Sequence, residues 1–206
     1  MMAHVTAGLA AELADVVTEL RRVTVRVQSS GAASGSGVLW DLDGGDDSSG
    51  LVITNAHVAT RAQASIQFSD GAVAHARVVA RDRRRDLAAL ALDPEPRPAA
   101  GFAPVRAAPP LQVGELVIAI GHPGGGLVGA ATLGIVHTAG GDRAGGPPAW
   151  IRADLRLAPG FSGGPLADSS GTLIGINTMM QGGLALAVPA ALVQSWLRRT
   201  LAPAVP

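Results

Sequence analysis

The chain of 206 residues contains no cysteine and no lysine, and it has only six aromatic side chains. Without cysteine it can form no disulfide, no cysteine-ligated zinc site and no thiol nucleophile. Its sixteen cations are all arginines, and sixteen acidic residues bring the formal net charge to zero. A neutral chain with so few rings lacks the basic surface and the stacking platform that nucleic-acid-binding proteins use. We therefore expect neither nucleic acid nor an anionic membrane as a partner.

Long apolar runs are absent as well. The sequence has no stretch of about 18 apolar residues, the length that a membrane-spanning helix needs. Near the N-terminus, Glu12, Asp15 and Glu19 interrupt the segment in which a signal peptide carries an unbroken apolar core. As written, the sequence predicts a cytoplasmic location without a membrane anchor.

The sequence is instead rich in short periodic segments separated by its 27 glycines and 14 prolines. Apolar residues recur at helical spacing over 8–22, and valines alternate with polar residues over 23–28, which is typical of a half-buried strand. A closing helix follows Pro189, with Arg198 and Arg199 in its last turn. Further strands are expected at about 36–40, 51–54, 64–69, 73–80, 87–92, 115–120, 130–137, 149–154, 164–167, 172–178 and 184–188.

This order of elements predicts an all-β fold of two six-stranded antiparallel β-barrels with short N- and C-terminal helices. A cleft between two such barrels is the natural place for a ligand. The expected division of this single domain is an N-terminal helical segment at 1–22, a first barrel at 23–98, a connector at 99–110, a second barrel at 111–188, and a C-terminal helix and tail at 189–206.

Three positions at strand edges carry residue types that work together in nucleophilic catalysis. His57 follows an apolar strand, Asp86 stands just before another, and Ser162 lies among glycines. A serine hydroxyl is almost un-ionised at neutral pH, so it needs a neighbouring base such as histidine. A buried carboxylate orients that base, and glycines let two backbone N–H groups face the developing oxyanion, each worth about 3 kcal/mol. The joint occurrence is a much stronger signal than any of the three alone.

The chain order of these residues separates two kinds of serine hydrolase. Residues 160–164 also fit the G-x-S-x-G nucleophile elbow, but that fold places its histidine after the serine. All five histidines here precede Ser162. The order His, Asp, Ser is the chymotrypsin-type order.

With these motifs the chain resembles the protease domain of the HtrA/Deg family, within the trypsin-like serine peptidases. The resemblance implies a serine endopeptidase that hydrolyses peptide bonds of unfolded or misfolded proteins through an acyl-enzyme, in protein quality control, without a metal or another cofactor. It also implies a homo-oligomer, a trimer in many relatives. The matching stretches, within about residues 22–200, are GSGVLW (35–40), LVITNAHV (51–58), RDLAAL (85–90), ELVIAIGHPGG (115–125), LGIVHTAG (133–140), IRADLRLAPGFSGGPL (151–166), GTLIGINT (171–178) and LALAVP (184–189).

Carried over residue by residue, the resemblance implies His57 as general base, Asp86 as its orienting carboxylate and Ser162 as nucleophile. The backbone N–H groups of Gly160 and Ser162 would form the oxyanion hole. Asp154 matches an aspartate that the family carries ahead of the serine loop.

The resemblance also places a specificity pocket. Ala185, Leu186 and Ala187 match the strand that lines it, and Arg156 stands where trypsin's preference for basic side chains needs an aspartate. Cleavage after Lys or Arg is therefore not expected. Two alternatives stay open: an apolar pocket for small or medium aliphatic side chains, or a preference for acidic side chains through Arg156.

Several positions depart from the family pattern. Phe161 stands where the family usually has Asn, and a ring there cannot receive a freed N-terminus and could block or reshape the site. Ala158 replaces another common Asn, and the chain as given ends at Pro206 without a PDZ module. These departures motivate an alternative, a catalytically silent or partner-activated domain that binds peptides or serves as a regulatory subunit. His122 is expected to be a polar surface group rather than a metal ligand.

Overall fold

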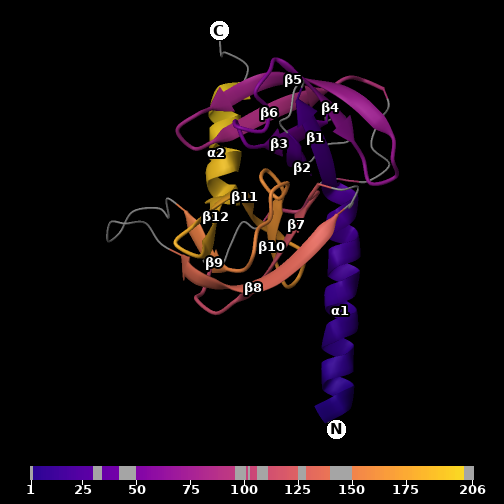
Figure 1. Ribbon diagram of the computed structural model, residues 1–206, viewed down its shortest axis with the longest axis vertical. Helices are drawn as coiled ribbons and strands as arrows, with labels where there is room; N and C mark the ends of the chain where they lie inside the picture. Colours follow the sequence, from indigo (N-terminus) through magenta and orange to yellow (C-terminus); the bar gives the residue numbers. More distant parts are fainter. Residues whose placement is uncertain are drawn as a thin grey trace.

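The computed structural model describes residues 2–29, 34–41, 50–95, 101, 103–105, 111–124, 129–139 and 150–201. Its strands form two closed six-stranded antiparallel barrels, as the sequence predicts (Figure 1). The first barrel has the strand order β1-β2-β3-β6-β5-β4 and the second has the order β10-β11-β12-β9-β8-β7. The strands are β1 (Thr24–Ser29), β2 (Ser34–Trp40), β3 (Leu51–Thr54), β4 (Gln63–Gln67), β5 (Val73–Asp82), β6 (Leu87–Leu92), β7 (Leu116–Gly121), β8 (Ala130–Ala139), β9 (Ile151–Asp154), β10 (Pro165–Asp168), β11 (Leu173–Gln181) and β12 (Leu184–Pro189).

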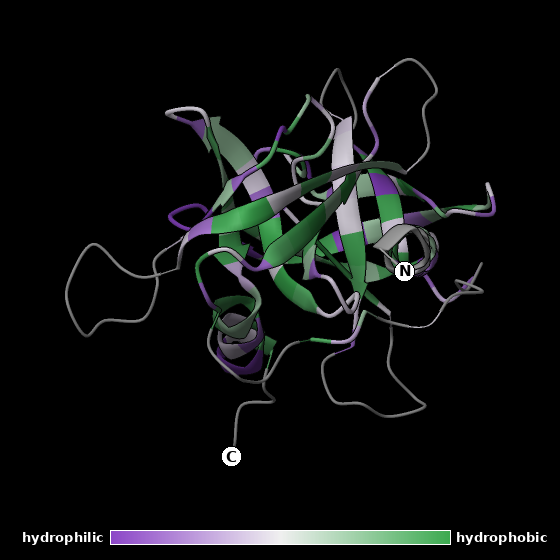
Figure 2. Cartoon of the chain, turned by 90° about the horizontal axis from the view of Figure 1, so that it is seen from below, coloured by the Kyte–Doolittle hydropathy of each residue, from purple (hydrophilic) through white to green (hydrophobic). Residues whose placement is uncertain are grey.

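Each barrel is closed around its own apolar interior, and in Figure 2 the hydrophobic colour runs along the strands of both. The first interior includes Val52, Ile66 and Leu90, all with no exposed surface. The second includes Ile151 and Leu166, which are equally buried. Because strands in a closed barrel pair on both edges, each backbone is fixed along its length and can aim a side chain at a strand end.

The helix α2 (Ala190–Leu201) joins the two barrels. Its buried residues Val193, Trp196 and Leu197 belong to one cluster with Trp40 of the first barrel and Ile176 of the second. A shared apolar cluster of this kind fixes the barrels relative to each other, which matters because the two halves of the expected site come from different barrels.

The first helix, α1 (Met2–Val23), is longer than the 8–22 predicted. Leu20 packs against Ile118 and Ile120 of β7, while the N-terminal half of the helix projects away from the barrels (Figure 1). No helix in the described ranges is long and apolar enough to cross a membrane.

Most of the expected connector at 99–110 lies outside the described residues, because only 101 and 103–105 are described there. The same holds for residue 149 of the expected ninth strand and for the tail after 201. The division of the chain into segments therefore stays a prediction, although the strands themselves closely match the expected ranges.

Candidate active site

His57 and Asp86 meet at one end of the first barrel. The His57 Nδ1 lies 2.6 Å from Asp86 Oδ2, and the His57 backbone N–H donates to Asp86 Oδ1 over 3.0 Å. The imidazole side chain is 50% exposed and the carboxylate only 18%. A carboxylate that accepts both the ring and the backbone N–H of one histidine fixes the orientation of that ring, and it favours the tautomer with its proton on Nδ1.

The backbone around Asp86 is tied to the turn that carries His57. The Asp86 carbonyl accepts the Ala56 N–H over 3.1 Å and the Asn55 side-chain amide over 2.9 Å. Asp86 has φ of 54°, the one non-glycine residue with positive φ in the described part of the chain. Left-handed backbone at a non-glycine residue is uncommon and is best tolerated by Asp and Asn. In this left-handed conformation both the carbonyl and the carboxylate of Asp86 accept hydrogen bonds from residues 55–57.

Ser162 lies on a tight loop that enters β10. Gly160 has φ of 102° and Gly163 has φ of 83°, a backbone region open to glycine. A Cβ at Gly160 would collide with the His122 carbonyl, and a Cβ at Gly163 would collide with the Ser36 carbonyl. The glycines that the sequence places around the serine are therefore required by both conformation and close approach.

The hydroxyl of Ser162 does not bond to His57 in this structure. It donates to the carbonyl of Thr178 over 2.9 Å. The pairing of β11 with β12 shifts register between Asn177 and Met179, which makes Thr178 the extra residue of a bulge. A bulge leaves its residue outside the regular ladder, so the Thr178 carbonyl is free to accept this hydroxyl. Sequence reasoning missed this acceptor, since a main-chain oxygen has no residue type to signal it.

The backbone N–H groups of Gly160 and Ser162 donate no hydrogen bond to any described residue. Their neighbours do: the Phe161 N–H donates to the Ala158 carbonyl over 3.1 Å, and the Gly163 N–H donates to the Asn177 carbonyl over 2.8 Å. The loop is thus held at alternate peptide groups. The N–H groups of Gly160 and Ser162, which alternate with these two, are the pair that a tetrahedral oxyanion would need.

The ring of Phe161 points away from the nucleophile. It is only 4% exposed and belongs to the apolar interior of the second barrel. A Cβ added at Gly121 of β7 would lie 2.5 Å from the Phe161 Cγ, so glycine at 121 makes room for the ring. The expectation of a ring that obstructs the site is therefore not supported by its position: Phe161 anchors the serine loop in the core.

The expected pocket residues fall into two groups. Ala185, Leu186 and Ala187 are all buried in β12, and Ala185 and Ala187 belong to the same apolar interior as Phe161. Arg156 is exposed, and it makes no hydrogen bond or ion pair with any described residue. Asp154, at the end of β9, is also exposed.

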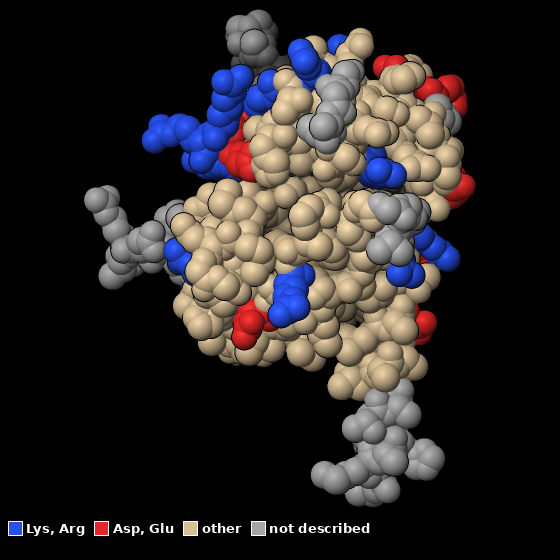
Figure 3. Space-filling model, in the orientation of Figure 1, with Lys and Arg blue, Asp and Glu red and all other residues tan. Residues whose placement is uncertain are grey.

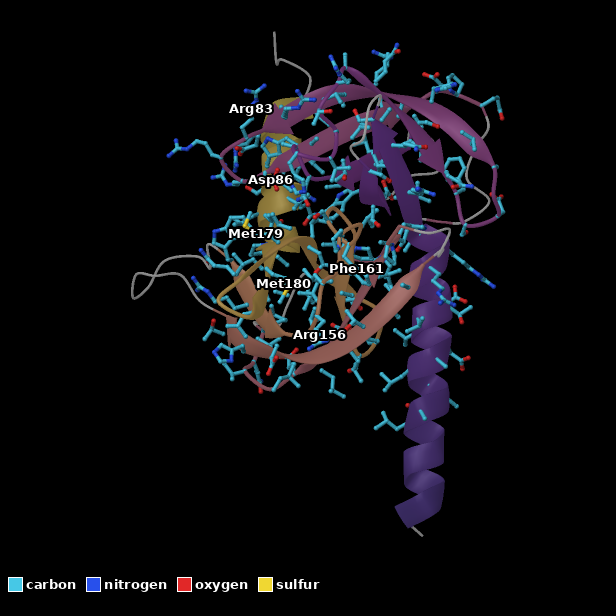
Figure 4. All side chains as sticks on the ribbon, in the orientation of Figure 1. Arg83, Asp86, Arg156, Phe161, Met179 and Met180 are labelled. Atoms are coloured by element: carbon cyan, nitrogen blue, oxygen red, sulfur yellow. The ribbon has the colours of Figure 1, made fainter. Side chains whose placement is uncertain are left out.

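The face seen in Figure 3 is mostly uncharged; its largest group of cations lies over the first barrel, and single cations lie over the second barrel. In Figure 4 the labels Arg83, Asp86, Met179, Met180 and Arg156 follow one another down this face, from the first barrel to the second. Both methionines are exposed, and the sequence prediction of the site did not include them. Exposed unbranched apolar side chains of this kind are candidates for contact with an apolar ligand.

His122 is not the surface group that the sequence led us to expect. It is 5% exposed, and its ring Nδ1 lies 3.1 Å from the hydroxyl oxygen of Ser36. Burial, with a smaller contribution from the charge of Arg26, lowers the pKa of His122 to about 4. The prediction was wrong because the Gly-rich surroundings of His122 suggested an exposed loop, whereas the ring is buried and lies against Ser36 of β2.

Known proteins share this arrangement of strands and motifs. Residues 35–176 match the family described as trypsin-like peptidase domain. The chain is 36% identical over 167 residues to the putative serine protease HhoA of Synechocystis sp., covering 77% of this chain and 40% of that protein. It is 33% identical over 205 residues to serine protease HTRA1 of Xenopus tropicalis, covering 90% and 42% respectively.

Among solved structures, the serine endoprotease from Yersinia pestis matches with a TM-score of 0.77 and 27% sequence identity. The match covers 92% of this chain and 66% of that one. The chain spans less than half the length of the two curated relatives.

Proposed function

The chain belongs to the trypsin-like peptidase family, with HtrA-type serine proteases among its relatives, and from that premise we propose that it is a serine endopeptidase acting on protein substrates. The observation that carries this proposal is the 2.6 Å contact between His57 Nδ1 and Asp86 Oδ2. A histidine oriented in this way presents its Nε2 lone pair as a base. Ser162, on the glycine-rich loop of the second barrel, is the nucleophile that this base serves.

Catalysis begins with a rotation of the Ser162 side chain. Its hydroxyl leaves the Thr178 carbonyl and turns to His57 Nε2, exchanging one hydrogen bond for another at a cost of about 1 kcal/mol or less. His57 then takes the hydroxyl proton while Ser162 Oγ bonds to the carbonyl carbon of the scissile peptide. Asp86 stabilises the imidazolium that results.

The later steps use the same groups. The N–H groups of Gly160 and Ser162 stabilise the tetrahedral oxyanion, and His57 gives its proton to the leaving amine as the carbon–nitrogen bond breaks. The acyl-enzyme on Ser162 is then attacked by water, whose proton His57 accepts. Collapse of the second tetrahedral intermediate releases the acid product and returns the proton to Ser162 Oγ.

The unpaired edge of β11 favours a substrate that binds in an extended conformation. Pairing with β10 ends at Ile176, whereas pairing with β12 continues to Gln181. The edge of 179–181 that faces away from β12 is unpaired in the described part of the chain, so an extended peptide can add there as a further strand. The exposed Met179 and Met180 suit apolar side chains of such a peptide. Only an unfolded or locally unfolded protein offers this segment, which supports misfolded chains as substrates.

Arg156 is the residue we assign to substrate preference. Because Ala185 and Ala187 face the filled interior of the barrel, they leave little apolar surface for a substrate side chain. An exposed guanidinium without a described partner favours the acidic alternative, since a substrate carboxylate can form a charge-assisted hydrogen bond with it.

A partner-activated or catalytically silent domain is the second candidate. The hydrogen bond from Ser162 to Thr178 favours it, because in that rotamer the Ser162 hydroxyl is not bonded to its base. A homo-oligomer and a cytoplasmic location stay predictions of the sequence.

The proposal is tested with one substrate protein in an unfolded and a native form. Reduced, carboxymethylated α-lactalbumin is unfolded, and its calcium-bound native form is the matched control. We expect the chain to cleave the unfolded form, to spare the native form, and to lose cleavage in Ser162→Ala and His57→Ala. Equal cleavage by wild type and Ser162→Ala would overturn the proposal, and cleavage only after a second protein is added would favour the partner-activated alternative.

A further inference from the structure

One serine of the first barrel contacts both residues of the proposed oxyanion hole. Ser36, in β2, has no exposed surface. Its backbone N–H donates to the Ser162 carbonyl over 2.8 Å, and its hydroxyl donates to the Gly160 carbonyl over 2.7 Å. The Ser36 carbonyl in turn accepts the hydroxyl of Thr54 over 2.6 Å, which fixes Ser36 within its own barrel.

His122 completes this contact from the second barrel. Its backbone N–H donates to Ser36 Oγ over 2.9 Å and also lies 3.2 Å from the Gly160 carbonyl oxygen. Its ring Nδ1 lies 3.1 Å from the same Ser36 oxygen. A serine hydroxyl has a single proton, and Ser36 gives it to Gly160. The ring must therefore donate to Ser36, which assigns the proton of the neutral imidazole to Nδ1.

The buried ring of His122 is uncharged at neutral pH, because burial disfavours the imidazolium. With a pKa lowered to about 4, His122 is neutral at neutral pH and carries one ring proton. That proton is the one directed at Ser36. The hydroxyl of Ser36 thus accepts two N–H groups from His122 and has its own proton left for Gly160 alone.

We infer that Ser36 and His122 are positioning residues for the oxyanion hole: they hold the Gly160–Phe161 peptide group, and this fixes the Gly160 Cα from which the Gly160 N–H projects toward the substrate carbonyl. The inference deepens the proposed function and rests on it. Neither side chain touches the reacting atoms; both act through the backbone of Gly160 and Ser162. No sequence pattern indicates this role, since Ser36 lies more than 120 residues from the loop it holds.

The loop needs such a brace because Gly160 is the residue most free to turn. Its φ of 102° lies in a region that glycine enters readily and leaves as readily. Two donors on its carbonyl, Ser36 Oγ and the backbone N–H of His122, fix the side of the residue that follows the Cα. The Gly160 carbonyl shares its peptide group with the Phe161 N–H, whereas the Gly160 N–H belongs to the preceding peptide group and is linked to the carbonyl through the Cα. If the 160–161 peptide group turns, the Cα shifts and carries the Gly160 N–H with it. A displacement of about 1 Å in a catalytic donor can cost about a hundredfold in rate.

The test compares four variants of the whole chain with wild type. Ser36→Ala removes the hydroxyl but keeps the backbone N–H that holds Ser162. His122→Ala removes the ring, whereas His122→Asn keeps a side-chain N–H that can donate to Ser36. Ser29→Ala is the matched control, because Ser29 is also buried in the first barrel and accepts the Arg61 N–H, with no hydrogen bond to the described part of the serine loop. Each is assayed for kcat and KM on unfolded α-lactalbumin, for its rate of fluorophosphonate labelling at Ser162, and for Tm.

We expect Ser36→Ala to lower kcat and the labelling rate by about a hundredfold, with KM within threefold of wild type. His122→Ala should lower both rates by about tenfold, and His122→Asn should restore most of that loss. Ser29→Ala should match wild type in rate, with a Tm within a few degrees of that of Ser36→Ala.

Three results would overturn the inference: a kcat of Ser36→Ala within threefold of wild type, a loss that falls on KM alone, or no difference between His122→Ala and His122→Asn. If Ser36→Ala fails to fold, the comparison of His122→Ala with His122→Asn tests the inference by itself. Failure of the proposed function is a different result: the wild-type chain would neither cleave unfolded α-lactalbumin nor react with the fluorophosphonate at Ser162. That result would overturn the inference as well.

Discussion

The two halves of the candidate site are built in different ways. The Asp86 carboxylate accepts two hydrogen bonds from His57, one from the ring and one from the backbone N–H, and the Asp86 carbonyl accepts two more from 55–56, all inside the first barrel. Ser162 is held within the second barrel by a single hydroxyl bond to Thr178. No hydrogen bond in the described part of the chain joins His57 to Ser162. In the proposed mechanism, the base is thus arranged in advance, whereas the nucleophile needs one rotation of its side chain.

Among these changes, Asp86→Asn should lower activity the most, because it removes the carboxylate that orients His57. Asparagine tolerates the positive φ of this position and keeps the turn, but its amide no longer stabilises the imidazolium or the correct ring tautomer. We expect kcat on unfolded α-lactalbumin to fall by about ten thousandfold. Thermal unfolding checks that the fold is kept, and a fall of less than tenfold would show that the pair orients no base.

The serine half depends on packing instead of ion pairing, so Phe161→Ala should act through stability. Emptying the space of this buried ring should lower the free energy of unfolding by about 3–5 kcal/mol, measured by urea denaturation. Phe161→Leu is the control and should cost less, since it refills part of the space. An unfolding midpoint unchanged in Phe161→Ala would contradict a ring that anchors the loop.

The substrate end of the site should respond to Arg156→Gln. Peptides with Glu at the scissile position should lose about tenfold in kcat/KM, the size of one charge-assisted hydrogen bond, while peptides with Ala there should not change. Arg83→Gln, at the other end of this face (Figure 4), is the matched control. Equal losses on both peptides would show that Arg156 supports the loop and does not select the substrate.

The smallest expected effect is a pH-dependent change in Tm caused by His122, the residue of the second barrel that contacts Ser36 of the first. In the unfolded chain the imidazole of His122 titrates near 6.5, but in the folded chain its pKa is lowered to about 4. Between these pH values the unfolded chain binds a proton that the folded chain does not, so the free energy of unfolding decreases as pH falls through this window. Wild type should therefore lose a few degrees more of Tm than His122→Asn between pH 7.5 and 4.5. Parallel Tm curves would contradict a buried neutral ring.

The barrels and the three catalytic candidates were predictable because residue types and chain order constrain them strongly. Alternating valines specify strands, and the order His, Asp, Ser with glycines around the serine is specific to the chymotrypsin-type arrangement. The Thr178 carbonyl could not be predicted, because a bulge exposes a backbone atom that every residue has. The direction of Phe161 and the burial of His122 were missed for a related reason: both depend on a strand residue that is distant in sequence, Gly121 of β7 for Phe161 and Ser36 of β2 for His122.

The length of α1 was also underestimated, and here local propensity accounts for the error. The first residues of the chain contain no regular apolar stripe to signal an amphipathic helix, so the prediction began at residue 8. The helix nevertheless starts at Met2, which agrees with the alanines in this stretch, since alanine has the highest intrinsic helix propensity.

The central claim is that Ser162 is a nucleophile activated by His57, and fluorophosphonate labelling followed by peptide mass spectrometry tests it without knowledge of the natural substrate. We predict one adduct, located on Ser162, that is absent in Ser162→Ala and strongly slowed in His57→Ala. An adduct that forms equally fast without His57, or no adduct on Ser162 in the wild-type chain, would contradict the claim.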